Sequence, residues 1–131
     1  MKYTLHEEGY IGSRLDIQLP VSEDKKVKIK VDYATSTSCT ALQWMTPSQT
    51  AGKKHPYVFS QCQAIHARSM VPCQDSPSVK ASYTAEITAP AELAVLMSAV
   101  RVGEPLTGSG TNTGKRVHSF NQKIPIQVSN Y

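Results

Sequence analysis

The sequence predicts a mainly β protein, built from antiparallel strands with one short helix, as a single domain of 131 residues. Two observations support this prediction: apolar and polar residues alternate with a period of two, and Pro, Gly, Ser and Thr cluster between the alternating segments. The alternation is clearest in residues 26–33, where Val27, Ile29, Val31 and Tyr33 are separated by polar residues. Period two over eight residues indicates a strand with one buried and one solvated face.

Residues 13–19 alternate in the same way, through Leu15, Ile17 and Leu19. A short polar link, residues 21–25, joins this segment to residues 26–33, so we expect an antiparallel hairpin between the two. The polar face of the second segment carries three lysines and is best explained as solvated sheet surface, which also opposes edge-to-edge aggregation.

The later segments are shorter and more mixed. Residues 41–45 are apolar and hold the only Trp, and residues 46–56 are typical of a loop. Strands are predicted at 57–59, 82–88 and 116–126, and a flexible connection at 106–114. Residues 64–70 favour a short helix that stops before Pro72, whereas residues 92–102 are compatible with either a helix or a strand.

Composition excludes several classes of protein. The net charge of +4 and the pI of 9.0 are compatible with nucleic-acid binding. However, aromatic residues make up only 7% of the sequence and do not interleave with the lysines, so a nucleic-acid-binding role is not favoured. The sequence has no apolar run long enough for a membrane-spanning helix, and its start lacks the pattern of a signal peptide. Three cysteines without a CxxC pair indicate free thiols in a reducing compartment, so we expect a cytoplasmic protein.

Catalytic residues are not evident within the chain. The four histidines are scattered and no His-Glu-x-x-His motif occurs, so no metal site is predicted. Cys62 and His66 are four residues apart and could form a nucleophile pair on one helix. However, Cys62 is predicted to lie at a strand end, and a buried structural thiol is the favoured interpretation. The glycine-rich residues 108–115 lack the spacing of a phosphate loop.

The block from residue 57 to residue 80 contains the strongest candidates for a binding site. Gln61 and Gln63 fall at a predicted strand-to-helix junction, where their amides could bind a peptide or an amine. The alternative, favoured on the residues alone, is that these amides satisfy local backbone groups. For Arg68 and Asp75 we expect an ion pair that orders the loop between Pro72 and Pro77.

The same block carries a resemblance to a known family. Residues 41–80 are similar, almost residue for residue, to the leukotriene A-4 hydrolase/aminopeptidase B-like branch of the M1 zinc metallopeptidases, and specifically to their N-terminal domain. The resemblance continues more loosely through residues 83–87, 96–104 and 120–126, and it is weak over the first forty residues. The family motif is matched here by Arg68, Pro72, Cys73, Asp75 and Pro77.

The resemblance implies a β-sandwich-like, saddle-shaped domain that packs over a thermolysin-like catalytic domain. It implies that Gln61, Cys62 and Gln63 form a substrate-binding element, in which Gln63 holds the α-amino group of a peptide or lines a channel for a lipid epoxide. Zinc is then the cofactor of the parent enzyme's catalytic domain. The chain itself is expected to contain no catalytic residue and to be inactive alone.

Two further expectations follow from the resemblance. Relative to the family domain, the first strands are expected to precede Met1 and another strand to follow Ile126, so the chain is expected to be an incomplete domain without the zinc domain. Unpaired edges would then favour marginal stability or self-association. The alternative function is a non-catalytic β-sandwich module that binds other proteins.

Overall fold

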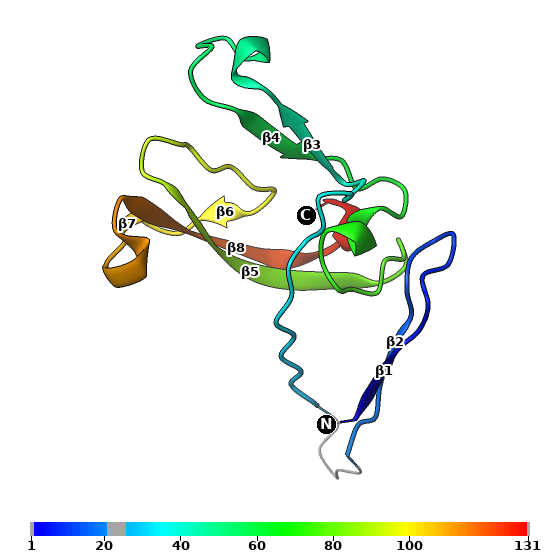
Figure 1. The fold of residues 1–131 in the computed structure, drawn as a ribbon. Coiled ribbons are helices and arrows are strands. Elements are labelled where there is room, and N and C mark those ends of the chain that lie inside the picture. Colours follow the sequence, from blue (N-terminus) through cyan, green and yellow to red (C-terminus); the bar gives the residue numbers. More distant parts are fainter. Residues whose placement is uncertain (1, 21–25, 131) are drawn as a thin grey trace.

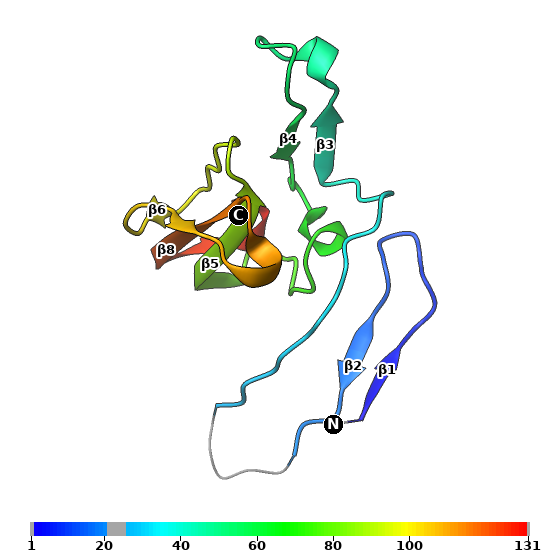
Figure 2. The same cartoon turned by 60° about the vertical axis from the view of Figure 1, so that its left-hand side comes forward.

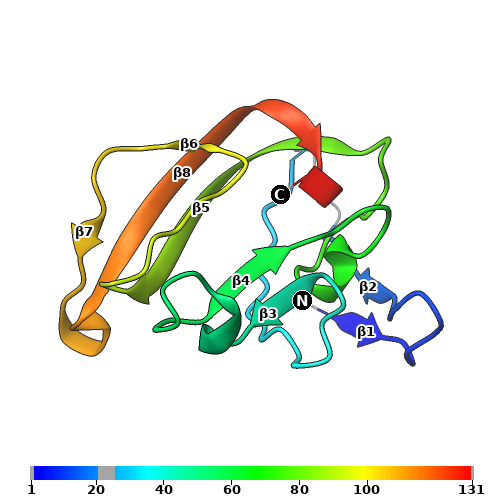
Figure 3. The ribbon, with the colours of Figure 1, turned by 90° about the horizontal axis from the view of Figure 1, so that it is seen from above.

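The computed structural model describes residues 2–20 and 26–130, which form three antiparallel sheets joined by loops and 3-10 turns. Figure 1 shows a long curved ribbon of two strands, with one hairpin rising above it and a second hairpin beside it. Seen from above, the two hairpins lie on the same side of this ribbon (Figure 3). The prediction of a mainly β, antiparallel fold is confirmed.

The first sheet pairs β1 (Tyr3–Leu5) with β2 (Leu15–Ile17), so that Thr4 lies opposite Asp16. The chain turns at Gly12, whose φ of 106° is a conformation that L side chains rarely adopt. The predicted hairpin between residues 13–19 and 26–33 is therefore wrong. The first alternating segment pairs instead with the N-terminal residues, whose three-residue strand is too short to show a period in the sequence.

Residues 26–33 do not form a strand. Their backbone is extended, but it joins no ladder within the described residues, and every residue from 26 to 38 is exposed. The turn-like link predicted at residues 21–25 lies outside the described residues. Figure 2 shows the segment after this link running separately from the three sheets. Despite their alternating pattern, residues 26–33 therefore pair with no strand within the described chain.

The second sheet is a hairpin of β3 (Leu42–Met45) and β4 (Tyr57–Ser60), with Leu42 opposite Ser60. The loop predicted between them is present and contains the 3-10 turn η1 (Pro47–Gln49). The amide oxygen of Gln49 accepts a hydrogen bond from the Thr46 backbone N–H at 2.9 Å, which fixes the start of the turn.

The third sheet contains the two longest strands, β5 (Lys80–Pro90) and β8 (Lys115–Gln127), both close to their predicted positions. Within β5 the residues with partly buried side chains alternate with exposed ones, as expected for a strand with one covered face. Two short strands, β6 (Val100–Arg101) and β7 (Leu106–Thr107), pair with the other edge of β8. The ambiguous residues 92–102 are thus a loop that ends in a strand, and η3 (Gly110–Asn112) leads into β8.

The predicted helix at residues 64–70 is reduced to the 3-10 turn η2 (Ala67–Ser69), preceded by turn residues. The Ser69 hydroxyl donates to the His66 carbonyl at 2.7 Å, and the Ser69 N–H donates to the same oxygen at 3.0 Å. These two bonds to one carbonyl favour the tighter 3-10 geometry, in which each N–H bonds three residues back. A longer helix is also prevented because Pro72 has no backbone N–H to donate. A further 3-10 turn, η4 (Val128–Asn130), follows β8.

The core of the described chain is small. Its buried apolar residues are Ala41, Cys62, Ala67, Phe120 and Val128, and most of its large apolar side chains are exposed. Four of the five form one cluster, which joins the start of β3, the segment after β4, η2 and η4. The best-packed part of the protein is therefore the region around residues 61–75.

Candidate functional site

The segment Gln61–Gln63 leaves β4 on a well-anchored backbone. The Gln61 N–H donates to the Ala41 carbonyl at 2.8 Å, which extends the hairpin by one bond beyond Ser60. The Cys62 carbonyl accepts from the His66 N–H at 2.9 Å, which ties the segment to the turn that follows. The three residues are therefore held from both sides.

Cys62 is the inward-facing member of this segment. It is 2% exposed and packs in the core cluster with Ala41, Ala67 and Val128. Burial is the main cause that raises the pKa of its thiol, followed by the nearby Asp75 carboxylate. The thiol is consequently neutral, and it contributes as an apolar anchor.

The glutamines on either side of Cys62 are exposed. Within the part of the chain that the structure describes, neither the Gln61 nor the Gln63 side chain makes a hydrogen bond. The peptide bond between Gln63 and Ala64 is cis. Each amide thus presents one acceptor and two donor positions to solvent from an anchored backbone.

The thiol–imidazole pair considered from the sequence is not formed. The His66 Nδ1 atom lies 2.9 Å from the Thr40 hydroxyl, and Cys62 lies in the core with a raised pKa. A nucleophilic cysteine needs a lowered pKa and access to solvent. The geometry therefore favours the structural role of Cys62.

Arg68 and Asp75 are joined by an extensive set of hydrogen bonds, which we call the Arg68–Asp75 clamp. The Asp75 Oδ2 atom accepts from the Arg68 backbone N–H at 3.0 Å and from Nε at 3.1 Å. The Arg68 Nη2 atom donates to the Asp75 carbonyl at 3.0 Å, and Nη1 donates to the Ile11 carbonyl at 3.1 Å. The clamp thus connects η2, the loop before β5 and the tip of the β1–β2 hairpin.

The other motif residues lie around this clamp. Pro72, Cys73 and Pro77 are exposed in the loop that Asp75 closes. The Val79 N–H donates to the Ser76 carbonyl at 3.0 Å, which forms a turn around Pro77. Desolvation is the main cause that raises the pKa of the Cys73 thiol, and the nearby Asp75 carboxylate raises it further. These residues shape the loop that Asp75 closes.

The histidines do not come together as metal ligands. Among residues 2–20 and 26–130, no three His, Cys, Asp or Glu side chains are grouped so that they could hold a metal ion. His6 bonds Asp16 at 2.8 Å, His66 bonds Thr40, and His118 bonds Arg101 at 3.0 Å. The described residues do not fit a catalytic zinc ion.

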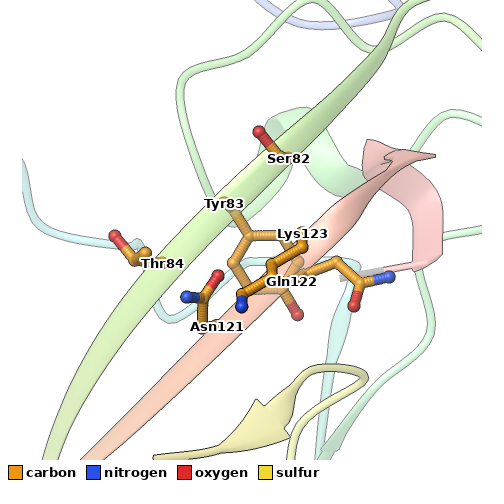
Figure 4. Close-up of a pocket in the computed structure, with 6 residues that line it drawn as sticks. All are labelled: Ser82, Tyr83, Thr84, Asn121, Gln122 and Lys123. Atoms are coloured by element: carbon orange, nitrogen blue, oxygen red, sulfur yellow. The ribbon is translucent and has the colours of Figure 1, made fainter.

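Two features were not predicted from the sequence. A shallow pocket of about 450 Å³ lies over the irregular register between β5 and β8. Figure 4 shows its lining residues, with the Tyr83 ring extending from β5 toward β8.

The second feature is the side chain of His118, which is buried beside Arg101. The Arg101 guanidinium lies 5.4 Å from the centre of the Phe120 ring. Both depend on cross-strand register, which single-strand periodicity does not reveal.

The fold and the motif place the chain in a known class, the N-terminal β-domains of zinc aminopeptidases. The chain belongs to the Peptidase M1 N-terminal domain family, which matches residues 3–131 and thus includes the first forty residues, where the resemblance was weak. Leukotriene A-4 hydrolase of Xenopus laevis is 48% identical over 120 residues, which cover 90% of this chain and 19% of that protein. Leucine aminopeptidase 2 of Yarrowia lipolytica is 51% identical over 115 residues, 88% of this chain and 16% of that protein.

A solved structure agrees with the sequence relatives. The native leukotriene A4 hydrolase from Saccharomyces cerevisiae matches 98% of this chain with a TM-score of 0.73 and 36% sequence identity. The match covers 18% of that structure's chain, so the present chain spans about a fifth of the length of the relatives it resembles. Within the described residues, no helix is long and apolar enough to cross a membrane.

Proposed function

We propose that this chain contributes a wall of the substrate site of an M1 aminopeptidase or bifunctional aminopeptidase/epoxide hydrolase, through Gln61, Cys62 and Gln63. Family membership supports the class of enzyme. The observation that carries the assignment to these residues is the outward presentation of two amides on either side of a buried Cys62. Zinc and the catalytic groups would come from a thermolysin-like domain outside residues 1–131, and the present chain alone would be inactive.

The chemistry of an amide suits a peptide's N-terminus. A glutamine carbonyl accepts a hydrogen bond from an ammonium group without adding a charge, and its NH2 group can donate to a peptide carbonyl. Because Gln61 and Cys62 are held by the hydrogen bonds to Ala41 and His66, little backbone entropy would be lost when a substrate binds. Fixing the amine in this way would orient the scissile bond toward the catalytic domain. With a lipid epoxide as substrate, the same three residues would line the channel that binds it.

The experiment replaces Gln61 and Gln63 by Ala, singly, in a full-length enzyme that carries this segment. We expect the KM for an aminoacyl-anilide to rise about tenfold or more for Gln63→Ala, because a hydrogen bond to a charged group is worth roughly 1.5–3 kcal/mol. Gln74→Ala is the matched control, since Gln74 is an exposed glutamine in the same block. Unchanged kinetics in both glutamine variants, with intact folding, would refute the assignment.

Inactivity of the isolated chain is tested separately. The 131-residue protein is assayed with an aminoacyl-anilide in the presence of added zinc. We expect no turnover above the uncatalysed rate. Turnover that a chelator abolishes would contradict the proposed division between this chain and a catalytic domain.

A second function is favoured by a different observation. The described chain exposes large apolar side chains on all three sheets, which is typical of a protein that binds another macromolecule. A non-catalytic interaction module would lose partner binding in edge-strand variants while the glutamine variants remain neutral. The kinetic experiment above therefore separates the two functions.

A further inference from the structure

The segment Gln61–Gln63 is held at its start and near its end by two backbone anchors from different parts of the fold. The Gln61 N–H donates to the Ala41 carbonyl at 2.8 Å, and the Cys62 carbonyl accepts from the His66 N–H at 2.9 Å. Ala41 directly precedes β3, and His66 directly precedes η2. How firmly the segment is held therefore depends on what joins these two anchors.

The Ser69 hydroxyl joins them. It accepts a hydrogen bond from the Ala41 N–H at 3.1 Å and donates to the His66 carbonyl at 2.7 Å. Ala41 thus uses its N–H for Ser69 and its carbonyl for Gln61. His66 uses its carbonyl for Ser69 and its N–H for Cys62. These bonds form a closed ring of contacts around the start of the segment.

A second link between the anchors runs through side chains. The Thr40 hydroxyl donates to the Ser69 hydroxyl oxygen at 3.3 Å, and it lies 2.9 Å from Nδ1 of His66. Because a hydroxyl carries a single proton, the Thr40 oxygen accepts the hydrogen bond from His66 Nδ1–H. This places the proton of the neutral imidazole on Nδ1 and fixes the orientation of the ring.

The Thr40–His66 bond lies at the end of an exposed turn. Residues 63–66 form this turn, and the Thr40 and His66 side chains are exposed as well. A hydrogen bond that competes with water adds little to the stability of a fold. It does limit the positions that the turn can take, and a group that is ordered in advance binds its ligand more tightly. The effect of this bond should therefore be visible in binding rather than in stability.

We propose that Thr40 and His66 are positioning residues of the substrate wall, whose side-chain bond holds the turn after Gln63 and so places the Gln63 amide before a substrate binds. The inference rests on the function proposed above for the segment Gln61–Gln63. Neither Thr40 nor His66 needs to contact the substrate, since both act through Gln63. Without their bond the turn has to be ordered during binding, which weakens binding and leaves the chemical step unchanged.

Paired substitutions test the bond in a full-length enzyme that carries this segment. His66→Asn keeps a nitrogen donor at the place of Nδ1, whereas His66→Gln keeps one only at the place of Nε2. Thr40→Ser keeps the hydroxyl, and Thr40→Val removes it with little change of shape. For His66→Gln and Thr40→Val we expect the KM for an aminoacyl-anilide to rise about three- to tenfold, with kcat within about twofold of the wild type. His66→Asn and Thr40→Ser should stay close to the wild type.

Thermal unfolding of each variant shows whether the bond has only a structural role. His55→Gln is the matched control, because His55 lies in the loop between β3 and β4, and its KM should not change. A lower melting temperature with an unchanged KM would mean that the bond serves the fold alone. That result, or equal KM values for His66→Asn and His66→Gln, would overturn the proposal.

A double-mutant cycle with Gln63→Ala separates this inference from the proposed function. If His66 acts through Gln63, adding His66→Gln to Gln63→Ala should raise the KM no further. Additive increases would show that His66 acts elsewhere, and would overturn its positioning role while the function of the wall stands. An unchanged KM in Gln63→Ala alone would instead refute the function proposed for the wall.

Discussion

The backbone and guanidinium of Arg68 make three hydrogen bonds to Asp75, two of them to the single carboxylate oxygen Oδ2. The Asp75 side chain is 2% exposed, whereas Arg68 remains 30% exposed. The other carboxylate oxygen, Oδ1, has no partner in the described structure. The charge of Asp75 is therefore compensated almost entirely by Arg68, although the two residues belong to different segments.

Removing Arg68 should destabilise the fold strongly. Arg68→Met leaves an uncompensated buried carboxylate, so we expect the free energy of unfolding to fall by about 3–5 kcal/mol. The change also removes the bond to the Ile11 carbonyl and releases the tip of the β1–β2 hairpin. Urea denaturation followed by circular dichroism measures the loss. Arg14→Met is the control, since Arg14 is an exposed partner of an exposed Asp16 and should change stability little.

The pair variant Arg68→Met/Asp75→Leu should be more stable than Arg68→Met alone. Replacing both members of a buried ion pair by apolar residues removes the desolvation cost together with the attraction. A double-mutant cycle gives the coupling energy. Strictly additive losses would show that the clamp acts through separate contacts rather than through its charges.

The small core around Ala67 should resist enlargement. Ala67 is fully buried in the cluster with Cys62, Ala41 and Val128, so a larger side chain there has to displace its neighbours. We expect Ala67→Leu to lower the free energy of unfolding by about 1–3 kcal/mol through overpacking. Ala64→Leu, on the exposed side of the same turn, should be close to neutral. Equal effects of the two substitutions would contradict the described packing.

The two longest strands, β5 and β8, were both predicted from the sequence close to their observed positions. In β5 and β8 the alternation extends over many residues, and each strand is the other's partner. Residues 26–33 have an equally regular pattern, yet they form no ladder in the described chain. Periodicity shows that a segment is suited to a sheet, but it does not say which strand pairs with it.

The candidate site shows the same division between local and long-range information. The order of Arg68, Pro72 and Asp75 along the chain was sufficient to anticipate the ion pair, because a short loop brings the two charges together. The bond from Arg68 to Ile11, 57 residues away, had no local signal. The exposure of Gln61 and Gln63 also depends on the burial of Cys62 by η4, which lies at the other end of the chain.

The three thiols should react in a defined order. Cys73 is exposed, Cys39 is partly buried at 3.3 Å from the Ser69 hydroxyl, and Cys62 is buried. With a thiol reagent under native conditions we expect Cys73 to react first and Cys62 last, the latter only when the core opens. Desolvation raises the pKa of the Cys73 thiol, so its rate should rise steeply with pH above neutrality. In urea the three rates should converge, and fast native labelling of Cys62 would contradict its burial.

Stability should decrease on mild acidification because of His118. The ring is 3% exposed, and its Nδ1 atom accepts a hydrogen bond from Arg101, so the neutral form carries its proton on Nε2. Burial lowers the pKa of His118 below 6.5, and Arg101 and Arg116 lower it further. Since the unfolded chain binds the proton more readily, the stabilisation is complete above pH 6.5 and is lost as pH falls through the folded-state pKa. His118→Phe should remove this component from the urea midpoint measured between pH 7 and pH 5. If the variant kept the full pH dependence of the wild type, another group would be responsible.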